Sequence, residues 1–76
     1  MGSKQKMLDR LSDTLRQTDE YQGRLVRMAY WNFGKQLQQV VIEIRDRGDV
    51  ILDVTGMRNM EIMVFVIDKL KKGVKK

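Results

Sequence analysis

The feature that most constrains the fold of this chain is a run of six consecutive apolar residues, Ile62 to Ile67, directly after Glu61. A chain of 76 residues forms one domain at most. A chain of this size buries only about 60–65% of the surface that it exposes when unfolded. Because its core is small, a run that is apolar on every side needs cover on more than one side. The sequence therefore raises the question of whether the chain itself or a partner provides that cover.

Leucines at helical spacing predict that the first half of the chain is helical. Leu8, Leu11 and Leu15 fall on one face with a period of 3.6 residues. After a polar middle, the same stripe continues through four further apolar residues: Val26, Tyr30, Phe33 and Leu37. One long helix and two helices broken near residues 18–23 both fit this pattern. We favour the broken form because Gly23 weakens a continuous helix.

The second half predicts a three-stranded antiparallel meander. Its strands are segments rich in Val and Ile that are separated by glycine-bearing turns: residues 40–44, 50–54 and 61–67. For the last segment, the β-branched side chains favour a strand. A rival interpretation makes residues 59–72 a helix. It rests on apolar residues at helical spacing: Met60, Met63, Val64, Ile67 and Leu70.

The first two strands predict a hairpin. A three-residue hairpin loop favours glycine at its third position, so residues 46–48 would form the loop. The pairs that follow are Arg45 with Asp49, Ile44 with Val50, Ile42 with Leu52, and Val40 with Val54. One face of the hairpin is then entirely apolar, which a shift of one residue would destroy.

The predicted fold is therefore α+β, with an N-terminal helix or helix pair packed on a three-stranded antiparallel meander. The rival order is α-β-β-α, with residues 59–72 helical. We expect a single small domain over residues 1–76, in which residues 71–76 form a flexible basic tail.

In this meander one sheet face packs on the helices and the other has no cover within the chain. The helical segment would also extend well beyond six-residue strands, because helices and strands of these lengths differ more than twofold in span. We therefore expect the chain to be an interaction or oligomerisation module that binds a second copy or a protein partner. A helix folded back over the open face is the alternative. The expected contact residues come from the outer sheet face and the overhanging helix: Val41, Ile51, Met63, Phe65, Ile67, Leu8, Leu11 and Leu15.

The net charge of +5 is concentrated at the C-terminus. Residues 1–68 contain ten basic and ten acidic residues, so the body of the chain is neutral. The excess comes from five lysines: Lys69, Lys71, Lys72, Lys75 and Lys76. Together with Trp31, which lies off the main apolar stripe, these lysines predict an alternative function. In that alternative the chain binds nucleic acid, with lysines on phosphates and Trp31 stacked on a base.

The chain contains no Cys, His or Pro. Without Cys and His it lacks the commonest metal ligands and the commonest general base. The acids Glu43, Asp53 and Glu61 lie on predicted strands and could approach one another on the outer face, but isolated strand acids usually pair with Arg or Lys. We therefore expect no catalytic residue, metal or cofactor. The missing residue types also fit a designed protein without a natural ligand.

Two further features concern location. No window reaches the roughly 18 apolar residues of a membrane span. The N-terminus also lacks the apolar core of a signal peptide. A cytoplasmic location is the expectation.

Residues 31–60 read WNFGKQLQQVVIEIRDRGDVILDVTGMRNM. They show an aromatic residue, a strand, a short acidic turn, a second strand, and an end that carries Gly and Arg. This order resembles the last strands of RelE/ParE-type toxins. The resemblance implies that Arg58 matches the terminal arginine of RelE-type ribonucleases. It covers less than half of the chain, and the first strand and the His–Arg pair of that family are missing.

Overall fold

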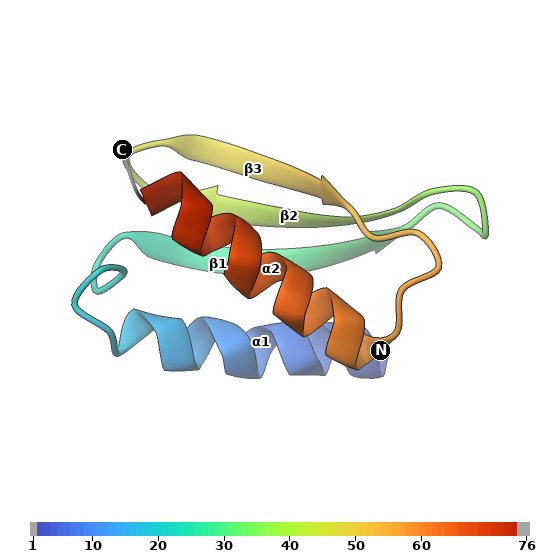
Figure 1. The fold of residues 1–76 in the computed structure, drawn as a ribbon, viewed down its shortest axis with the longest axis horizontal. Coiled ribbons are helices and arrows are strands. Elements are labelled where there is room, and N and C mark those ends of the chain that lie inside the picture. The colour runs from blue at the N-terminus through green and yellow to red at the C-terminus, as the bar shows by residue number, and fades with distance from the viewer. Residues whose placement is uncertain (1, 75–76) are drawn as a thin grey trace.

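The computed structural model describes residues 2–74 and shows the order α-β-β-β-α (Figure 1). The elements are α1 (Ser3–Arg16), β1 (Leu25–Asn32), β2 (Gln38–Ile44), β3 (Gly48–Asp53) and α2 (Asn59–Val74). The strands form one antiparallel sheet in the order β1-β2-β3, and both helices lie on the same face of it. The prediction of an α+β fold with an N-terminal helix and a three-stranded antiparallel meander is confirmed. Two segments nevertheless differ from the prediction: residues 25–32 form a strand in place of a helix, and residues 61–67 form part of a helix in place of a strand.

The N-terminal helix follows the predicted leucine pattern. Leu8 and Leu11 are buried, and Leu15 packs against the core from its edge. The helix ends at Arg16, and turns follow up to Gly23, whose φ of 75° favours glycine. The predicted break is therefore present. The predicted overhang is absent from α1, which has 14 residues and lies alongside β1 (Figure 1).

Residues 25–32 form strand β1, so the predicted helix in this region is wrong. Val26 and Tyr30 suggested a helical stripe, but Tyr30 pairs with Val40 across the sheet. The register shifts between Leu25 and Arg27, which marks a β-bulge at Val26. Because the bulge adds one residue, it breaks the alternation of two that would have identified a strand in the sequence.

β2 and β3 form the predicted hairpin, with a register that differs by two residues. The observed pairs are Ile44 with Gly48, Glu43 with Asp49, Ile42 with Val50, and Val40 with Leu52. The predicted pair of Arg45 with Asp49 is absent, and the turn comprises residues 45–47. A shift of two keeps every side chain on its predicted face. The apolar face is accordingly buried as expected, through Val40, Ile42, Ile44, Leu52 and Val54.

Residues 59–74 form helix α2, so the predicted strand over residues 61–67 is wrong and the rival helix is present. Ile62, Val66 and Leu70 recur every four residues and are all buried against the sheet. The backbone N–H of Arg58 donates to Oε1 of Glu61 at 2.8 Å, which supports the first turn. Packing of this stripe outweighs the strand preference of Val and Ile.

The structure describes only part of the predicted flexible tail, residues 71–76. α2 continues through residues 71–74, and residues 75–76 lie outside the described part of the chain.

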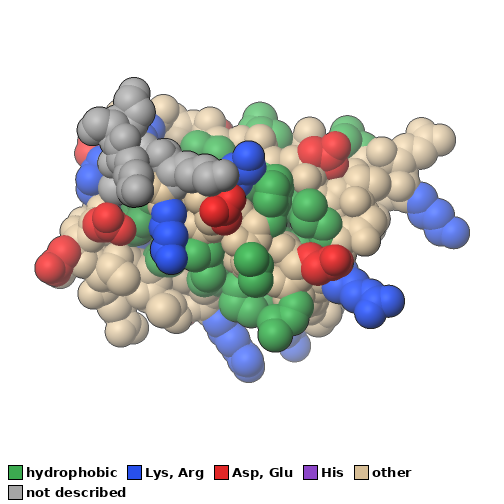
Figure 2. All heavy atoms as spheres, in the orientation of Figure 1, with side chains coloured by type: hydrophobic (Ala, Val, Ile, Leu, Met, Phe, Trp, Pro, Cys, Tyr) green, Lys and Arg blue, Asp and Glu red, His purple; other side chains and the backbone are tan. Residues whose placement is uncertain are grey.

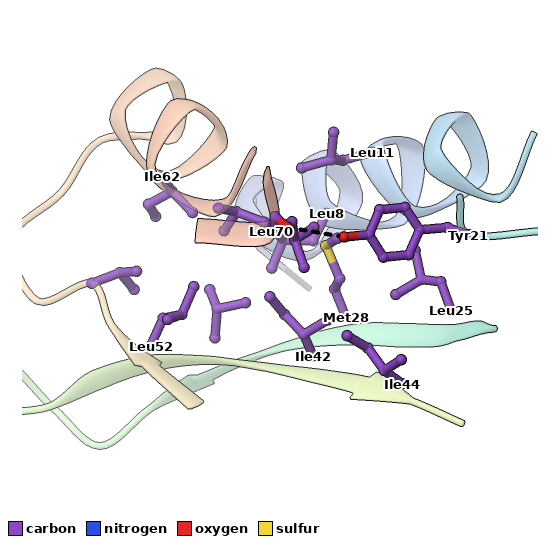
Figure 3. Close-up of a cluster of buried hydrophobic side chains, with 13 residues drawn as sticks. Leu8, Leu11, Tyr21, Leu25, Met28, Ile42, Ile44, Leu52, Ile62 and Leu70 are labelled. Carbon is purple, nitrogen blue, oxygen red and sulfur yellow. Dashed lines mark hydrogen bonds between the residues drawn. The ribbon is translucent and has the colours of Figure 1, made fainter. Parts of the chain in front are cut away.

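The core lies between the two helices and the inner sheet face (Figure 3). Leu8 of α1 and Ile62 of α2 belong to the same cluster as Met28 and Ile42 of the sheet, and all four side chains are fully buried or nearly so. Tyr21, in the turn after α1, donates its hydroxyl hydrogen to the Leu70 carbonyl at 3.2 Å. Burial raises the pKa of this tyrosine above its ordinary value. Tyr21 thereby connects the end of α1 to the last turns of α2.

Side chains of α1 cover the free edge of β1. Gln5 donates from Nε2 to the Met28 carbonyl at 3.0 Å, and its Oε1 accepts from the Tyr30 N–H at 2.8 Å. Arg16 donates from Nε to the Leu25 carbonyl at 3.2 Å. These groups occupy hydrogen-bonding positions that a fourth strand would otherwise fill. The edge of β1 is therefore closed to pairing with another chain.

We expect Gln5→Glu to lower the free energy of unfolding by about 1–3 kcal/mol at pH 7, because a carboxylate then faces the Met28 carbonyl. The pKa of this glutamate should be raised in the folded state. The destabilisation by this glutamate is therefore absent at pH values below its unfolded-state pKa, and it develops as the pH rises through its folded-state pKa. Urea unfolding at pH 4 and pH 7 measures this. The exposed Gln36→Glu is the control, and an equal effect of both substitutions would refute the edge role of Gln5.

Candidate functional site

Helix α2 is apolar on two opposite sides. One side carries the buried residues Ile62, Val66 and Leu70. On the solvent side, Met60 is 70% exposed and Val64 is 65% exposed. The solvent side of a surface helix is normally polar. Figure 2 shows hydrophobic side chains gathered on the face where α2 lies.

A shallow hollow of about 560 Å³ lies on this surface. It is lined by Met57, Met60, Glu61, Val64, Phe65 and Asp68, which we call the outer α2 surface. Its walls are mainly apolar, and two carboxylates stand at its rim. The Lys69 ammonium lies 5.3 Å from the centroid of the Phe65 ring, within the range of a cation–π contact. The surface thus combines an apolar centre with charges of both signs.

A second hollow, of about 450 Å³, lies between α1 and α2. It is lined by Met7, Arg10, Leu11, Thr14, Met63 and Ile67. Four of the six methionines of the chain, Met7, Met57, Met60 and Met63, line one of these two hollows. Methionine side chains are flexible and polarisable, and they adapt to the shape of a partner surface. The helical layer therefore presents an adaptable apolar surface.

The structure divides the predicted contact residues among three places. Leu8 and Leu11 lie in the core, and Leu15 packs at its edge. Met63, Phe65 and Ile67 lie half-buried on α2, because residues 61–67 are a helix. Val41 and Ile51 remain on the outer sheet face, as predicted.

The predicted contact set omitted Met57, Met60 and Val64. Met60 and Val64 belonged to the helical rival pattern for this segment. That pattern lacks Ile62 and Val66, which form the buried stripe together with Leu70, so it did not separate the buried side of the helix from its exposed side.

The outer sheet face is a second candidate surface. Ile51 is 59% exposed there, and Trp31 stacks on Phe33 with ring centroids 6.3 Å apart. Arg27 and Glu43 on the same face form an ion pair at 3.1 Å. Charged side chains therefore interrupt the apolar residues of this face.

The residues of the predicted nucleic-acid site are not brought together within the described chain. Trp31 lies near the β1–β2 turn, whereas Lys69 and Lys71 lie toward the end of α2, at the opposite end of the molecule (Figure 1). The side chain of Lys72, together with Lys75 and Lys76, lies outside the described part.

The acids singled out in the sequence also lie apart. Glu43 pairs with Arg27, Asp53 bonds to Thr55, and Glu61 lies in the first turn of α2 rather than on a strand. Within residues 2–74, no group of three acids could hold a metal ion. The side-chain hydrogen bond from Thr55 and its backbone N–H lower the pKa of Asp53. Arg58 is exposed at the start of α2.

The chain matches no family model, no curated protein and no solved structure, so its own geometry is the basis for a functional proposal. Within residues 2–74, neither helix is long and apolar enough to cross a membrane.

We expect Thr55→Val to raise the pKa of Asp53 toward its ordinary value, because the variant lacks the hydroxyl that donates to Oδ1 at 2.7 Å. Because the pKa of Asp53 is lower in the folded state than in the unfolded state, its carboxylate stabilises the fold at pH values above the unfolded-state pKa. This stabilisation is lost as the pH falls through the folded-state pKa. The variant should therefore lose less stability on acidification. NMR titration of the Asp53 carboxyl carbon measures the shift. Thr14→Val is the control, and an unchanged Asp53 titration in Thr55→Val would contradict the assignment.

We expect Val64→Lys to change the free energy of unfolding by less than about 0.5 kcal/mol, because Val64 faces solvent. Val66→Lys should prevent folding, because it buries an unpaired charge. Denaturant unfolding at low protein concentration compares the two variants. A loss of several kcal/mol in Val64→Lys would place Val64 in the core instead.

Proposed function

We propose that this chain is a non-enzymatic interaction module that binds a second copy of itself through the outer α2 surface. The supporting observation is the exposure of Met60 and Val64 one helical turn apart on a helix whose other side already packs on the sheet. Burial of apolar area of this kind drives most protein association. Contiguous exposed apolar surface is a common mark of an interface.

The shape of the surface favours a protein partner over a small molecule. All residues that line the larger hollow lie between Met57 and Asp68, on one helix and the loop before it. A surface built by one helix cannot enclose a ligand, whereas small-molecule sites bury most of the ligand. Peptide and protein partners dock on such helical surfaces through apolar anchors spaced by a helical turn.

The charges on α2 favour a second copy as the partner. Glu61 and Asp68 stand beside the apolar centre, and Lys69 and Lys71 follow toward the end of the helix. Helix α2 therefore carries acids beside the apolar centre and bases toward its end, and a complementary surface needs both. A chain with a small core also gains stability from association.

Nucleic-acid binding has weaker support. The separation of Trp31 from Lys69 and Lys71 removes the combined stacking and phosphate site on which that alternative rests.

Measurement of mass by sedimentation equilibrium, from micromolar to millimolar concentration, tests the proposal. We expect the mass to rise from 9.0 kDa toward twice that value. Val64→Lys should weaken dimerisation at least tenfold, or about 1.4 kcal/mol, because a charge replaces the central apolar contact.

Ile51→Lys is the matched control for this test. It places the same charge at an exposed apolar residue on the outer sheet face, and we expect unchanged association. A strict monomer at all concentrations, or disruption by Ile51→Lys alone, would overturn the proposal.

A further inference from the structure

We propose that the tip of the β1–β2 hairpin, residues 31–37, docks on the surface of a lipid bilayer. Three exposed apolar side chains of the tip enter the lipid: Trp31, Phe33 and Leu37. The ammonium of Lys35 meets the anionic headgroups. This inference is independent of the proposed function, because it concerns the end of the sheet and not the outer α2 surface. It follows from the placement, the size and the charge of the tip.

The three apolar side chains gather on one face of the tip. Trp31 pairs with Gln39 across the hairpin, and Phe33 stacks on Trp31 with an angle of 11° between the ring planes. The Phe33 N–H donates to the Leu37 carbonyl at 2.8 Å, which continues the strand pairing and sets Leu37 opposite Phe33. Trp31 is 49% exposed and Phe33 is 56% exposed. The tip therefore presents one contiguous apolar patch to solvent.

The tip extends beyond the rest of the described chain. Both helices cover the inner sheet face, and the β1–β2 hairpin continues past the ends at which they begin (Figure 1). Trp31, Phe33 and Leu37 lie outside the hydrophobic core cluster of the described residues. Packing within the fold therefore gives no reason for three large apolar side chains at this place.

The size and shape of the tip favour a lipid surface over a protein partner. An aromatic side chain buries about 150–250 Å², whereas a stable protein interface buries about 800 Å² on each partner. Two aromatic side chains and one leucine on a narrow, convex hairpin do not supply that area. A bilayer accepts such a group, because apolar side chains enter its headgroup region from the surface. Tryptophan is enriched there, since its ring is apolar and its indole N–H is polar.

The charge of the tip is complementary to an anionic lipid surface. Lys35 is the only charged residue among residues 28–42. Glu43 lies four residues from Gln39 along β2, about 13 Å from the base of the tip. Asp53 pairs with Gln39 on β3 and so lies at the base of the tip, not at its end. A bilayer at the end of the tip thus meets a cation first, and anionic lipids attract Lys and Arg near their surface.

Nucleic acid fits this surface less well, although exposed aromatic rings also stack on bases. A nucleic-acid strand that crossed the outer sheet face would meet more acids than bases on the paired residues: Glu43, Asp49 and Asp53 against Arg27. Binding to several phosphates needs several cations, and the tip supplies Lys35 alone.

Trp31 reports on the tip directly, because it is the only tryptophan of the chain. We expect its fluorescence emission to shift to shorter wavelength when micromolar protein is titrated with vesicles of three parts phosphatidylcholine to one part phosphatidylserine. Lipids brominated in their acyl chains should quench this emission. Phe33→Gln should lower the partition coefficient about tenfold, because one aromatic ring fewer leaves water.

Two matched variants locate the contact. Ile51→Gln removes an exposed apolar side chain of the outer sheet face away from the tip, and Val64→Gln removes one from the outer α2 surface. Both should keep the partition coefficient of the native chain. Loss of vesicle binding in either variant, with binding retained in Phe33→Gln, would overturn the inference. Urea unfolding should show that all three variants remain folded, because the substituted side chains are exposed.

A charge variant tests the preference for anionic lipid. Lys35→Glu should weaken binding to the phosphatidylserine vesicles several-fold and leave binding to pure phosphatidylcholine vesicles little changed. Lys71→Glu is the matched charge control at the opposite end of the molecule, and it should alter the preference much less, because salt screens distant charges. A preference that depends on Lys71 and not on Lys35 would contradict docking by the tip.

Three further results would overturn the inference. Trp31 emission that vesicles of both compositions leave unchanged would remove lipid as the partner. A spectral change with a single-stranded oligonucleotide and none with vesicles would assign the tip to nucleic acid. A weaker dimer in Phe33→Gln would assign it to the contact between copies. A strictly monomeric chain, in contrast, overturns the proposed function and leaves lipid docking in place.

Discussion

Burial of one face of a three-stranded sheet under two helices is the constraint on which the rest of this structure depends. Leu8 of α1 and Ile62 and Val66 of α2 are completely buried on that face, together with Val40 and Ile42 of β2. A chain of 76 residues has material for two layers and no more. The outer sheet face and the outer side of the helices must therefore remain at the surface, and their chemistry decides how the molecule meets its surroundings.

The exposed surfaces of the chain differ in their chemistry. Gln5 and Arg16 donate hydrogen bonds to backbone carbonyls at the edge of β1, and Asp49 and Asp53 place negative charge at the edge of β3. Ion pairing between Arg27 and Glu43 interrupts the outer sheet face. The outer α2 surface, in contrast, keeps an exposed apolar centre with charges beside it. This contrast directs the functional proposal to α2 and away from the sheet.

The parts of the fold that could be predicted depend on local patterns with a single interpretation. Three leucines at helical spacing identify α1, and the alternation around Gly48 identifies the buried face of the hairpin. The turn was predicted one residue too late, and the facial pattern could not reveal this error because a shift of two residues in the pairing leaves both faces unchanged. The register of β2 and β3 accordingly differs from the prediction while the core residues agree.

β1 and α2 could not be assigned securely from local patterns. A bulge at Val26 removes the alternation that would identify β1, and the apolar run before Asp68 fits a strand or a helix equally well in isolation. Because the run was predicted as a strand, the unpaired surface was expected on the sheet, and Met60 and Val64 were not expected as contact residues. Only the identity of the elements packed beneath α2 distinguishes its buried side from its exposed side.

The sequence by itself therefore determined the fold class, the first helix and the buried face of the hairpin. The tertiary structure decided the type of β1 and α2, and with it which apolar side chains remain exposed. The physical reason is that burial stabilises every apolar side chain, whereas only the packing of the whole chain decides which of these side chains are buried.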